Sequence, residues 1–164
     1  MKVSVIPCGE VVNESEALAI DRLKRNLQNT PTPHGQCPND EWILLTNLAF
    51  SVTNQVQSAD VDIIAIGPPG VRVIEVKHWS IGWCDANVDL MEKEADKLTF
   101  KARKIGTTLR RVAADLPRVD GAILLTRQPS KVQKLAERGQ VRGVSLYSLN
   151  QWKHAIGFEE PRVL

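Results

Sequence analysis

The chain has 164 residues, of which 43% are hydrophobic and 24% charged, and its formal net charge is +2. These values are typical of a soluble globular protein, and the length supports one domain with an ordinary core. A net charge this small excludes a whole-molecule attraction to nucleic acid, so any binding of phosphate has to come from local clusters of charge.

No apolar run approaches the length of a membrane helix, and the apolar opening segment is too short for a signal peptide. The three cysteines are odd in number and far apart, which argues against a disulfide framework and agrees with a reducing compartment. We therefore expect a cytoplasmic protein. A zinc site is not expected, because the spacings of the candidate ligands match no common finger. These candidates are His34, Cys37, His78 and Cys84.

The first predicted element is a helix over residues 13–28. Ile20, Leu23 and Leu27 form an apolar stripe at spacings of three and four. Glu16 lies one turn before this stripe, so it is the acidic residue of the helix that we expect to face inward. A carboxylate in the first turn is also favoured by the helix dipole, so a purely structural role for Glu16 stays open.

A loop is predicted over 30–40, where three prolines and a glycine interrupt the pattern. Three strands follow, at 42–50, 60–67 and 71–77. The Pro-Pro-Gly turn at 68–70 joins the last two, so the three form a meander.

Charged residues interrupt these apolar strands. Alternation at 71–77 places Glu75 and Lys77 on one face. On the preceding strand it places Asp62 with Ile64 and leaves Val61 on the opposite face. The hairpin can bring Asp62 beside Glu75.

Charges on strands this apolar are costly unless something pairs with them. A divalent cation between Asp62 and Glu75, with the Lys77 ammonium beside it to meet a phosphate or a water, is one way to pair them. An internal ion pair of Lys77 with Glu75 or Asp62, with no chemistry attached, is the other. The sequence leaves both open.

The second half of the chain begins with an irregular, exposed segment at 78–87. A long helix at 89–115 follows, with an unbroken apolar stripe. The stripe consists of Leu98, Ala102, Ile105, Leu109, Val112 and Leu116. A buried strand is predicted at 119–126. The remaining predictions are a helix at 130–138, a strand at 141–147 and a helix at 149–156.

Lys97, Lys101 and Lys104 lie together beside the stripe of the long helix. Such a group is usually a solvated face, and the alternative is a track for phosphate groups. The order of elements is αβββαβ followed by a further helix, strand and helix. This order predicts an α/β fold with a mixed central sheet flanked by helices on both sides.

The segment Ala-Asp-Val-Asp-Ile-Ile-Ala-Ile-Gly-Pro-Pro-Gly-Val-Arg-Val-Ile-Glu-Val-Lys-His-Trp, residues 59–79, resembles the central signature of the nuclease-related (NERD) domain. That family is a branch of the restriction-endonuclease-like PD-(D/E)xK superfamily. The resemblance implies the αβββαβ core of that superfamily and a phosphodiesterase that depends on Mg²⁺ or Mn²⁺. DNA is the implied substrate, with RNA as the alternative.

The resemblance also implies roles for single residues. Asp62 and Glu75 match the two metal-binding carboxylates, and Lys77 matches the lysine that positions the attacking water or steadies charge on the phosphate. Glu16 is the best match for the acidic residue of the first helix, with Glu14 close to it. Where related nucleases often carry a Gln early in the helix after the signature, this chain offers Lys101 or no clear counterpart.

Nucleic-acid contacts are expected from the three lysines of the long helix and from His78, which follows the signature directly and is alternatively a surface histidine. A second hypothesis is a catalytically silent module that binds nucleic acid or protein within a larger polypeptide, since residues 1–164 read as one NERD-like domain that a kinase or helicase region could follow. A third is an oligomerisation domain, a homo-oligomer whose partner surface uses the tryptophans. These are Trp42, Trp79, Trp83 and Trp152.

Overall fold

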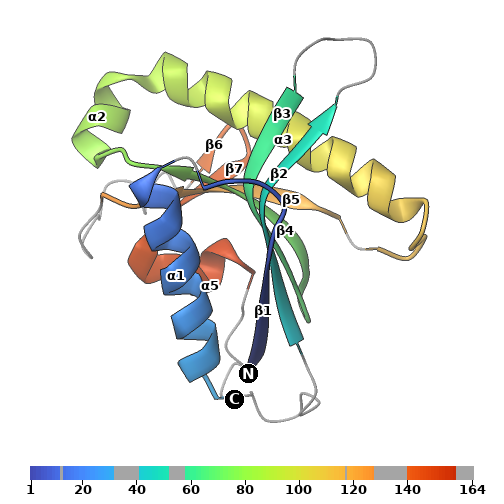
Figure 1. The fold of residues 1–164 in the computed structure, drawn as a ribbon. Helices are drawn as coiled ribbons and strands as arrows, with labels where there is room; N and C mark the ends of the chain where they lie inside the picture. Colours follow the sequence, from blue (N-terminus) through green and yellow to red (C-terminus); the bar gives the residue numbers. More distant parts are fainter. Residues whose placement is uncertain (12, 32–40, 52–57, 117, 128–139, 158–164) are drawn as a thin grey trace, which may run out of the picture.

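The computed structural model describes residues 1–11, 13–31, 41–51, 58–116, 118–127 and 140–157. Within these residues the chain forms one seven-stranded mixed sheet in the order β1-β2-β3-β4-β5-β7-β6. Helices α1 and α5 cover one face of the sheet, and α2 and α3 cover the other (Figure 1). The predicted α/β fold with helices on both sides of a mixed sheet is therefore confirmed.

The centre of the sheet is the predicted meander, in which β2, β3 and β4 pair antiparallel in sequence order. Parallel pairing extends it on both sides, through β1 beside β2 and through β5 and β7 beyond β4. The strands are β1 Lys2–Pro7, β2 Glu41–Ser51, β3 Ser58–Gly67, β4 Gly70–Lys77, β5 Asp120–Leu125, β6 Gln140–Val141 and β7 Val144–Ser148.

Helix α1 (Glu14–Asn29) confirms the first predicted helix. Its buried residues Ala19, Leu23 and Leu27 pack onto Trp42 and the other residues on that face of the sheet, which we call the α1 core. Gly67 lies against the Trp42 ring, where any side chain would collide with the indole. The α1 core therefore fixes one face of β2, β3 and β4.

Helix α3 (Val88–Arg110) packs on the opposite face. Ala95, Leu98 and Ala102 are buried there against strand residues such as Val73 and Ile123, and we call this cluster the α3 core. Alternation in β4 is as predicted, because Val73 belongs to the α3 core and Ile74 to the α1 core.

The long helix is shorter than predicted. It ends at Arg110, so Val112 is not on a buried stripe but is 86% exposed. The chain has to reverse there to enter β5 at Asp120, which ends the packing that would hold another turn of helix.

The segment 78–87 is also corrected, because it contains the short helix α2 (Ile81–Ala86) and is not irregular throughout. Ser80 caps this helix by accepting a hydrogen bond from Trp83 N. Cys84 is buried in the α3 core. Its burial was not predicted because the residues around it in the sequence are mostly small or polar.

Three smaller differences concern the ends of the sheet. The N-terminal strand β1 was not predicted. The predicted strand at 141–147 is a hairpin of β6 and β7, whose turn uses the left-handed conformations of Arg142 (φ 48°) and Gly143 (φ 78°). The last helix begins as a 3₁₀ turn at Leu149–Gln151 and continues as α5 (Trp152–Ala155). The predicted helix at 130–138 lies outside the described residues. No helix in the described part of the chain is long and apolar enough to cross a membrane.

Candidate functional site

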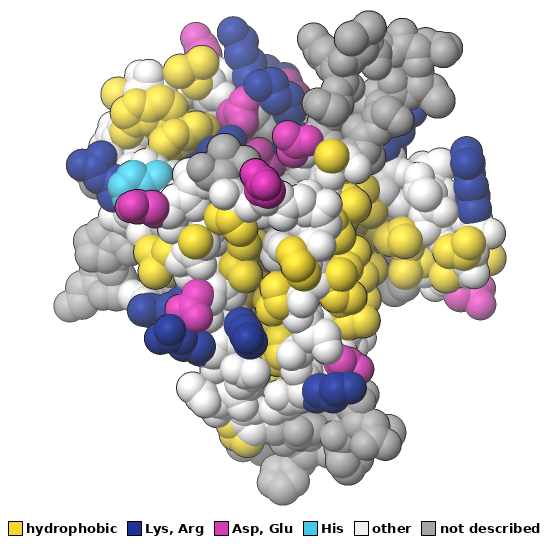
Figure 2. Space-filling model, viewed as in Figure 1, with side chains coloured by type: hydrophobic (Ala, Val, Ile, Leu, Met, Phe, Trp, Pro, Cys, Tyr) yellow, Lys and Arg dark blue, Asp and Glu magenta, His cyan; other side chains and the backbone are white. Residues whose placement is uncertain are grey.

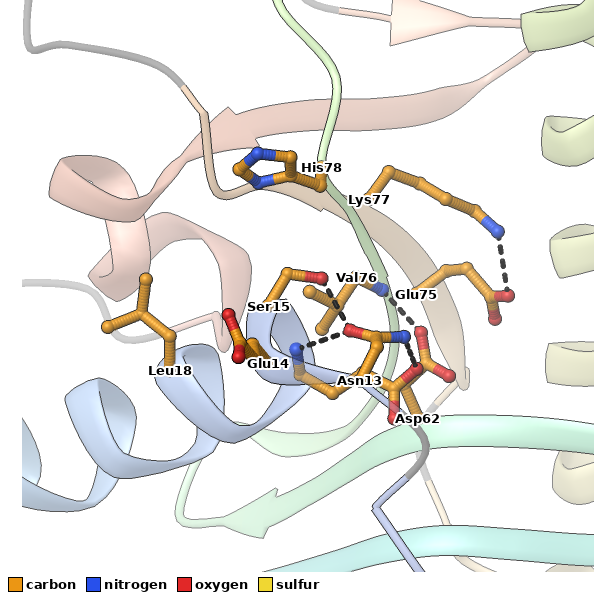
Figure 3. A pocket seen from close by; sticks show the side chains of 10 residues that line it. Asn13, Glu14, Ser15, Leu18, Asp62, Glu75, Val76, Lys77 and His78 are labelled. Atoms are coloured by element: carbon orange, nitrogen blue, oxygen red, sulfur yellow. Dashed lines mark hydrogen bonds and ion pairs between the residues drawn. The ribbon is translucent and has the colours of Figure 1, made fainter.

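A cavity of about 610 Å³ opens between the N-terminus of α1 and the C-terminal end of β4 (Figure 3). It brings together all four residues that the sequence proposes for catalysis. Its lining consists of Asn13, Glu14, Ser15, Glu16, Leu18, Asp62, Glu75, Val76, Lys77 and His78.

The end of one strand pairing places Asp62 in this cavity. The ladder between β3 and β4 is regular as far as the pair Ile63 and Ile74. One residue further, the Asp62 carboxylate replaces a backbone partner, since its Oδ2 accepts a 2.7 Å hydrogen bond from Val76 N. This bond holds the carboxylate beside Glu75, as the close view shows (Figure 3).

Both β2 and β3 change the side-chain pattern at this row of the sheet. Ile63 packs in the α1 core but Val61 packs in the α3 core, although strict alternation predicts one face for both. Leu44 and Leu48 on β2 differ in the same way. Between these β2 residues lies Asn47 at φ 53°, a left-handed backbone conformation. The predicted face of Val61 is therefore wrong, because the two strands shift together at the row that contains Asp62.

Glu16 reaches the cavity from α1, and only 6% of it is exposed. Asn13 caps the helix by accepting from Glu16 N at 3.0 Å, and its Nδ2 donates back to Glu16 Oε1. Glu16 therefore faces inward, as predicted, and also lies in the first turn of the helix. Glu14 also lines the cavity but is exposed.

The three carboxylates influence one another. Burial raises the pKa of Asp62 to about 7, and the charges of Glu75 and then Glu16 add to the rise, while the Val76 N–H and Lys77 oppose it. Burial is the largest cause, so the cavity favours the neutral form of the Asp62 carboxyl group, and the neighbouring carboxylates strengthen that preference.

Lys77 and Glu75 belong to a chain of ion pairs on the α3 side. Lys77 Nζ lies 3.3 Å from Glu75 Oε1 and 3.0 Å from Glu94 Oε2. Lys101 Nζ lies 3.0 Å from the other oxygen of Glu75, Oε2. Burial lowers the pKa of Lys77, but Glu75 and Glu94 outweigh it and the net pKa is raised.

The sequence was next compared with known families and structures. The nuclease-related domain model, NERD, matches residues 13–117, which is well over half of the chain. The chain belongs to the NERD family. The matched residues contain every proposed catalytic residue of this NERD domain.

One solved structure similar to the NERD domain is the crystal structure of protein VC1899 from Vibrio cholerae. The likeness covers 89% of this chain with 13% sequence identity and a TM-score of 0.42. The chain covers 35% of VC1899, about a third of that protein's length. None of the curated proteins compared matches the sequence.

The residues proposed for nucleic-acid binding are divided by the structure. Lys97 and Lys104 are exposed on α3, with Lys97 paired to Glu94 and the Lys104 ammonium 5.6 Å from the Phe100 ring centroid. The side chain of Lys101 is only 14% exposed, so it is part of the site and not of a solvated face. On the face seen in Figure 2, basic side chains are interspersed with acidic ones and form no continuous patch.

His78 lines the cavity and is exposed, and its Nδ1 lies 3.0 Å from Thr126 Oγ1. Its ring points away from Asp62 and Glu75 (Figure 3). Two tryptophans of the oligomer hypothesis are core residues, since Trp42 is fully buried and Trp152 is 9% exposed.

Glu94 is the residue of this network that the sequence prediction missed. It precedes Lys101 by seven residues, so both side chains lie on nearly the same side of α3. That spacing, together with Lys101 as the possible counterpart of the Gln in the helix after the signature, was the available signal.

Among the described residues, no group of three or more His, Cys, Asp or Glu side chains is arranged to hold a metal ion. His34 and Cys37 of the zinc candidates lie outside the described residues, and burial raises the pKa of Cys84 to about 11. The donor chemistry of Glu16, Asp62 and Glu75 nevertheless fits Mg²⁺, because that ion takes one or two carboxylates and several waters. Burial and the charges of Glu75 and Glu16 raise the pKa of Asp62, and a cation bound beside it would favour the ionised carboxylate.

Proposed function

We propose that this NERD domain is a metal-dependent phosphodiesterase that cleaves DNA. One observation supports the proposal above the others: Glu16, Asp62, Glu75 and Lys77 come from three separate elements and line the same cavity. Structural ion pairs alone do not require a solvent-filled space of about 610 Å³ beside them. A cavity that size has room for a cation, its waters and a phosphodiester group.

The carboxylates of Asp62 and Glu75, with Glu16 nearby, would hold Mg²⁺ or Mn²⁺. When bound, the ion supplies Lewis acidity and lowers the pKa of a coordinated water. The Val76 N–H orients Asp62, and the Asn13 side chain orients Glu16. Lys77 would offset negative charge that develops on the phosphate oxygens, since it is the cation that lines the same cavity.

The test is cleavage of plasmid and single-stranded DNA, with RNA in parallel, in the presence of Mg²⁺ or Mn²⁺. Asp62→Asn, Glu75→Gln and Lys77→Met should each lower the rate by roughly 100-fold or more. Asp60→Asn is the matched control, because Asp60 is exposed on the same strand two residues away. Wild-type cutting that persists undiminished in all three variants would rule out this site.

A catalytically silent binding module is the second candidate, and one observation favours it. Both carboxylate oxygens of Glu75 already lie within ion-pair distance of an ammonium. Its Oε1 pairs with Lys77 and its Oε2 pairs with Lys101. A glutamate neutralised in this way does not need a metal. Calorimetric titration with Mn²⁺ separates the candidates, since heat of binding that Asp62→Asn abolishes supports the phosphodiesterase and its absence in the wild type supports the module.

A further inference from the structure

The Lys77 ammonium lies between two carboxylates that come from different elements. Glu75 is its neighbour on β4, at 3.3 Å, and Glu94 approaches from α3, at 3.0 Å. The side chains of Lys77 and Glu94 are 22% and 21% exposed, so water screens this pair less than an ordinary surface pair. The shorter of the two contacts is the one to Glu94.

The backbone position of Glu94 is fixed by the residues on either side of it. Met91, Ala95 and Leu98 are buried in the α3 core and anchor this turn of the helix to the sheet. The other oxygen of Glu94, Oε1, accepts a 2.6 Å contact from Lys97, whose side chain is 66% exposed. Glu94 therefore has one partner at the surface and one in the site.

Glu75 is a weaker anchor for Lys77 than its position suggests. Its Oε2 is engaged by Lys101, and its carboxylate is one of those expected to face a cation in the cavity. A cation bound to Glu75 in the cavity would neutralise part of the charge of this carboxylate and so reduce its attraction for Lys77. Glu94 does not line that cavity, so its attraction for the ammonium is unaffected.

We propose that Glu94 is a positioning residue that holds the Lys77 ammonium at the edge of the cavity while Glu75 serves the bound cation. The proposal rests on the proposed function for its catalytic consequence. The competing role is a plain structural ion pair with Lys97, which would affect stability alone. The two roles differ in what happens to Lys77 when the charge of Glu94 is removed.

The test compares Glu94→Gln with two controls on the same helix. Glu92→Gln removes a carboxylate that pairs with Arg142, away from the site. Asp96→Asn removes a second exposed carboxylate, two residues from Glu94, that pairs with the same arginine. The first readout is steady-state cleavage of DNA with Mn²⁺. The second is the rate at which an acylating reagent modifies the Lys77 amine, with the modified residue identified by mass spectrometry.

Glu94→Gln should lower kcat by about 10-fold to 100-fold and leave KM within roughly twofold, as loss of an outer positioning group does. The Lys77 amine should be acylated several-fold faster in this variant, because it has lost one of its two carboxylate partners. Both controls should match the wild type in both readouts.

An unchanged acylation rate at Lys77 in folded Glu94→Gln would overturn the proposal, and so would a kcat equal to that of the wild type. A wild-type protein that cuts no nucleic acid would refute the proposed function instead. Acylation of Lys77 would then still decide whether Glu94 holds the ammonium, since that readout needs no turnover.

Discussion

Replacing Asp62 by Asn should stabilise the metal-free protein at neutral and alkaline pH. The Asp62 carboxylate is partly buried and faces the charges of Glu75 and Glu16, which is why its pKa is raised to about 7 from the ordinary value of 3.8. An Asn side chain has the same shape and still offers an oxygen to Val76 N, so the 2.7 Å hydrogen bond can be kept. The substitution removes the cost of burying the charge and the repulsion from the neighbouring carboxylates, and little else.

The sign and size follow from proton linkage. The folded state holds a proton on Asp62 that the unfolded state has already released, so the free energy of unfolding falls as pH rises from about 4 to about 7 and is then level. A pKa raised from 3.8 to about 7 corresponds to about 4 kcal/mol. Because Asp62 is in contact with solvent at the cavity and Lys77 moderates the repulsion, we expect about half of this, roughly 2 kcal/mol, at pH 8.

The assay is urea denaturation with EDTA at several pH values between 4 and 8.5. Asp62→Asn should exceed the wild type most at pH 8, and the difference should shrink below pH 7 and vanish near pH 4. Asp60→Asn, from an exposed position on the same strand, should show no such trend. If Asp62→Asn is less stable than the wild type at pH 8, or if the difference does not depend on pH, the carboxylates do not repel one another as described.

Three further outcomes are expected. Mn²⁺ at about 100-fold above its Kd should add about 2.7 kcal/mol to the free energy of unfolding of the wild type and nothing to that of Glu75→Gln. Equal thermal shifts in the two proteins would contradict binding at this site. Lys101→Met should cost about 1–3 kcal/mol in urea denaturation, because it leaves one oxygen of a buried glutamate without its partner, whereas the exposed Lys104→Met should cost almost nothing. Asn13→Ala should cost about 1 kcal/mol through loss of the helix cap, and an unchanged denaturation midpoint would show that the cap is unimportant.

The pattern of apolar residues predicted both long helices and β4 because each keeps one period throughout, and it predicted β2 and β3 because they alternate on either side of their shift. Glu75 and Lys77 lie on the predicted face, since β4 alternates without interruption. The face of Val61 could not be predicted in the same way. The shift at Asn47 and Asp62 leaves the pairing register unchanged but moves side chains to the opposite face, and a face assignment that assumes continuous alternation cannot detect it.

Helix α2 was missed for a different reason. Six residues are too few to display a helical period, and this helix is stabilised by its cap and by packing more than by intrinsic propensity. Trp79 and Trp83, whose ring centroids are 4.4 Å apart, pack together against the α3 core. Those contacts bridge the strand that carries Lys77 and the helix that carries Glu94.

The ion pairs show why the charge of the site cannot be read from the signature alone. Asp62, Glu75 and Lys77 are adjacent in the sequence pattern, but Glu16 adds a negative charge from α1, and Lys101 and Glu94 add opposite charges from α3. Burial raises the pKa of Asp62 to about 7, the charges of Glu75 and Glu16 add to the rise, and Lys77 opposes it. A NERD domain with the same signature and an uncharged residue in place of Lys101 would have a still greater excess of negative charge around Glu75. The residues of α3 therefore set the charge around Glu75, and with it how strongly the proposed metal site would attract a cation.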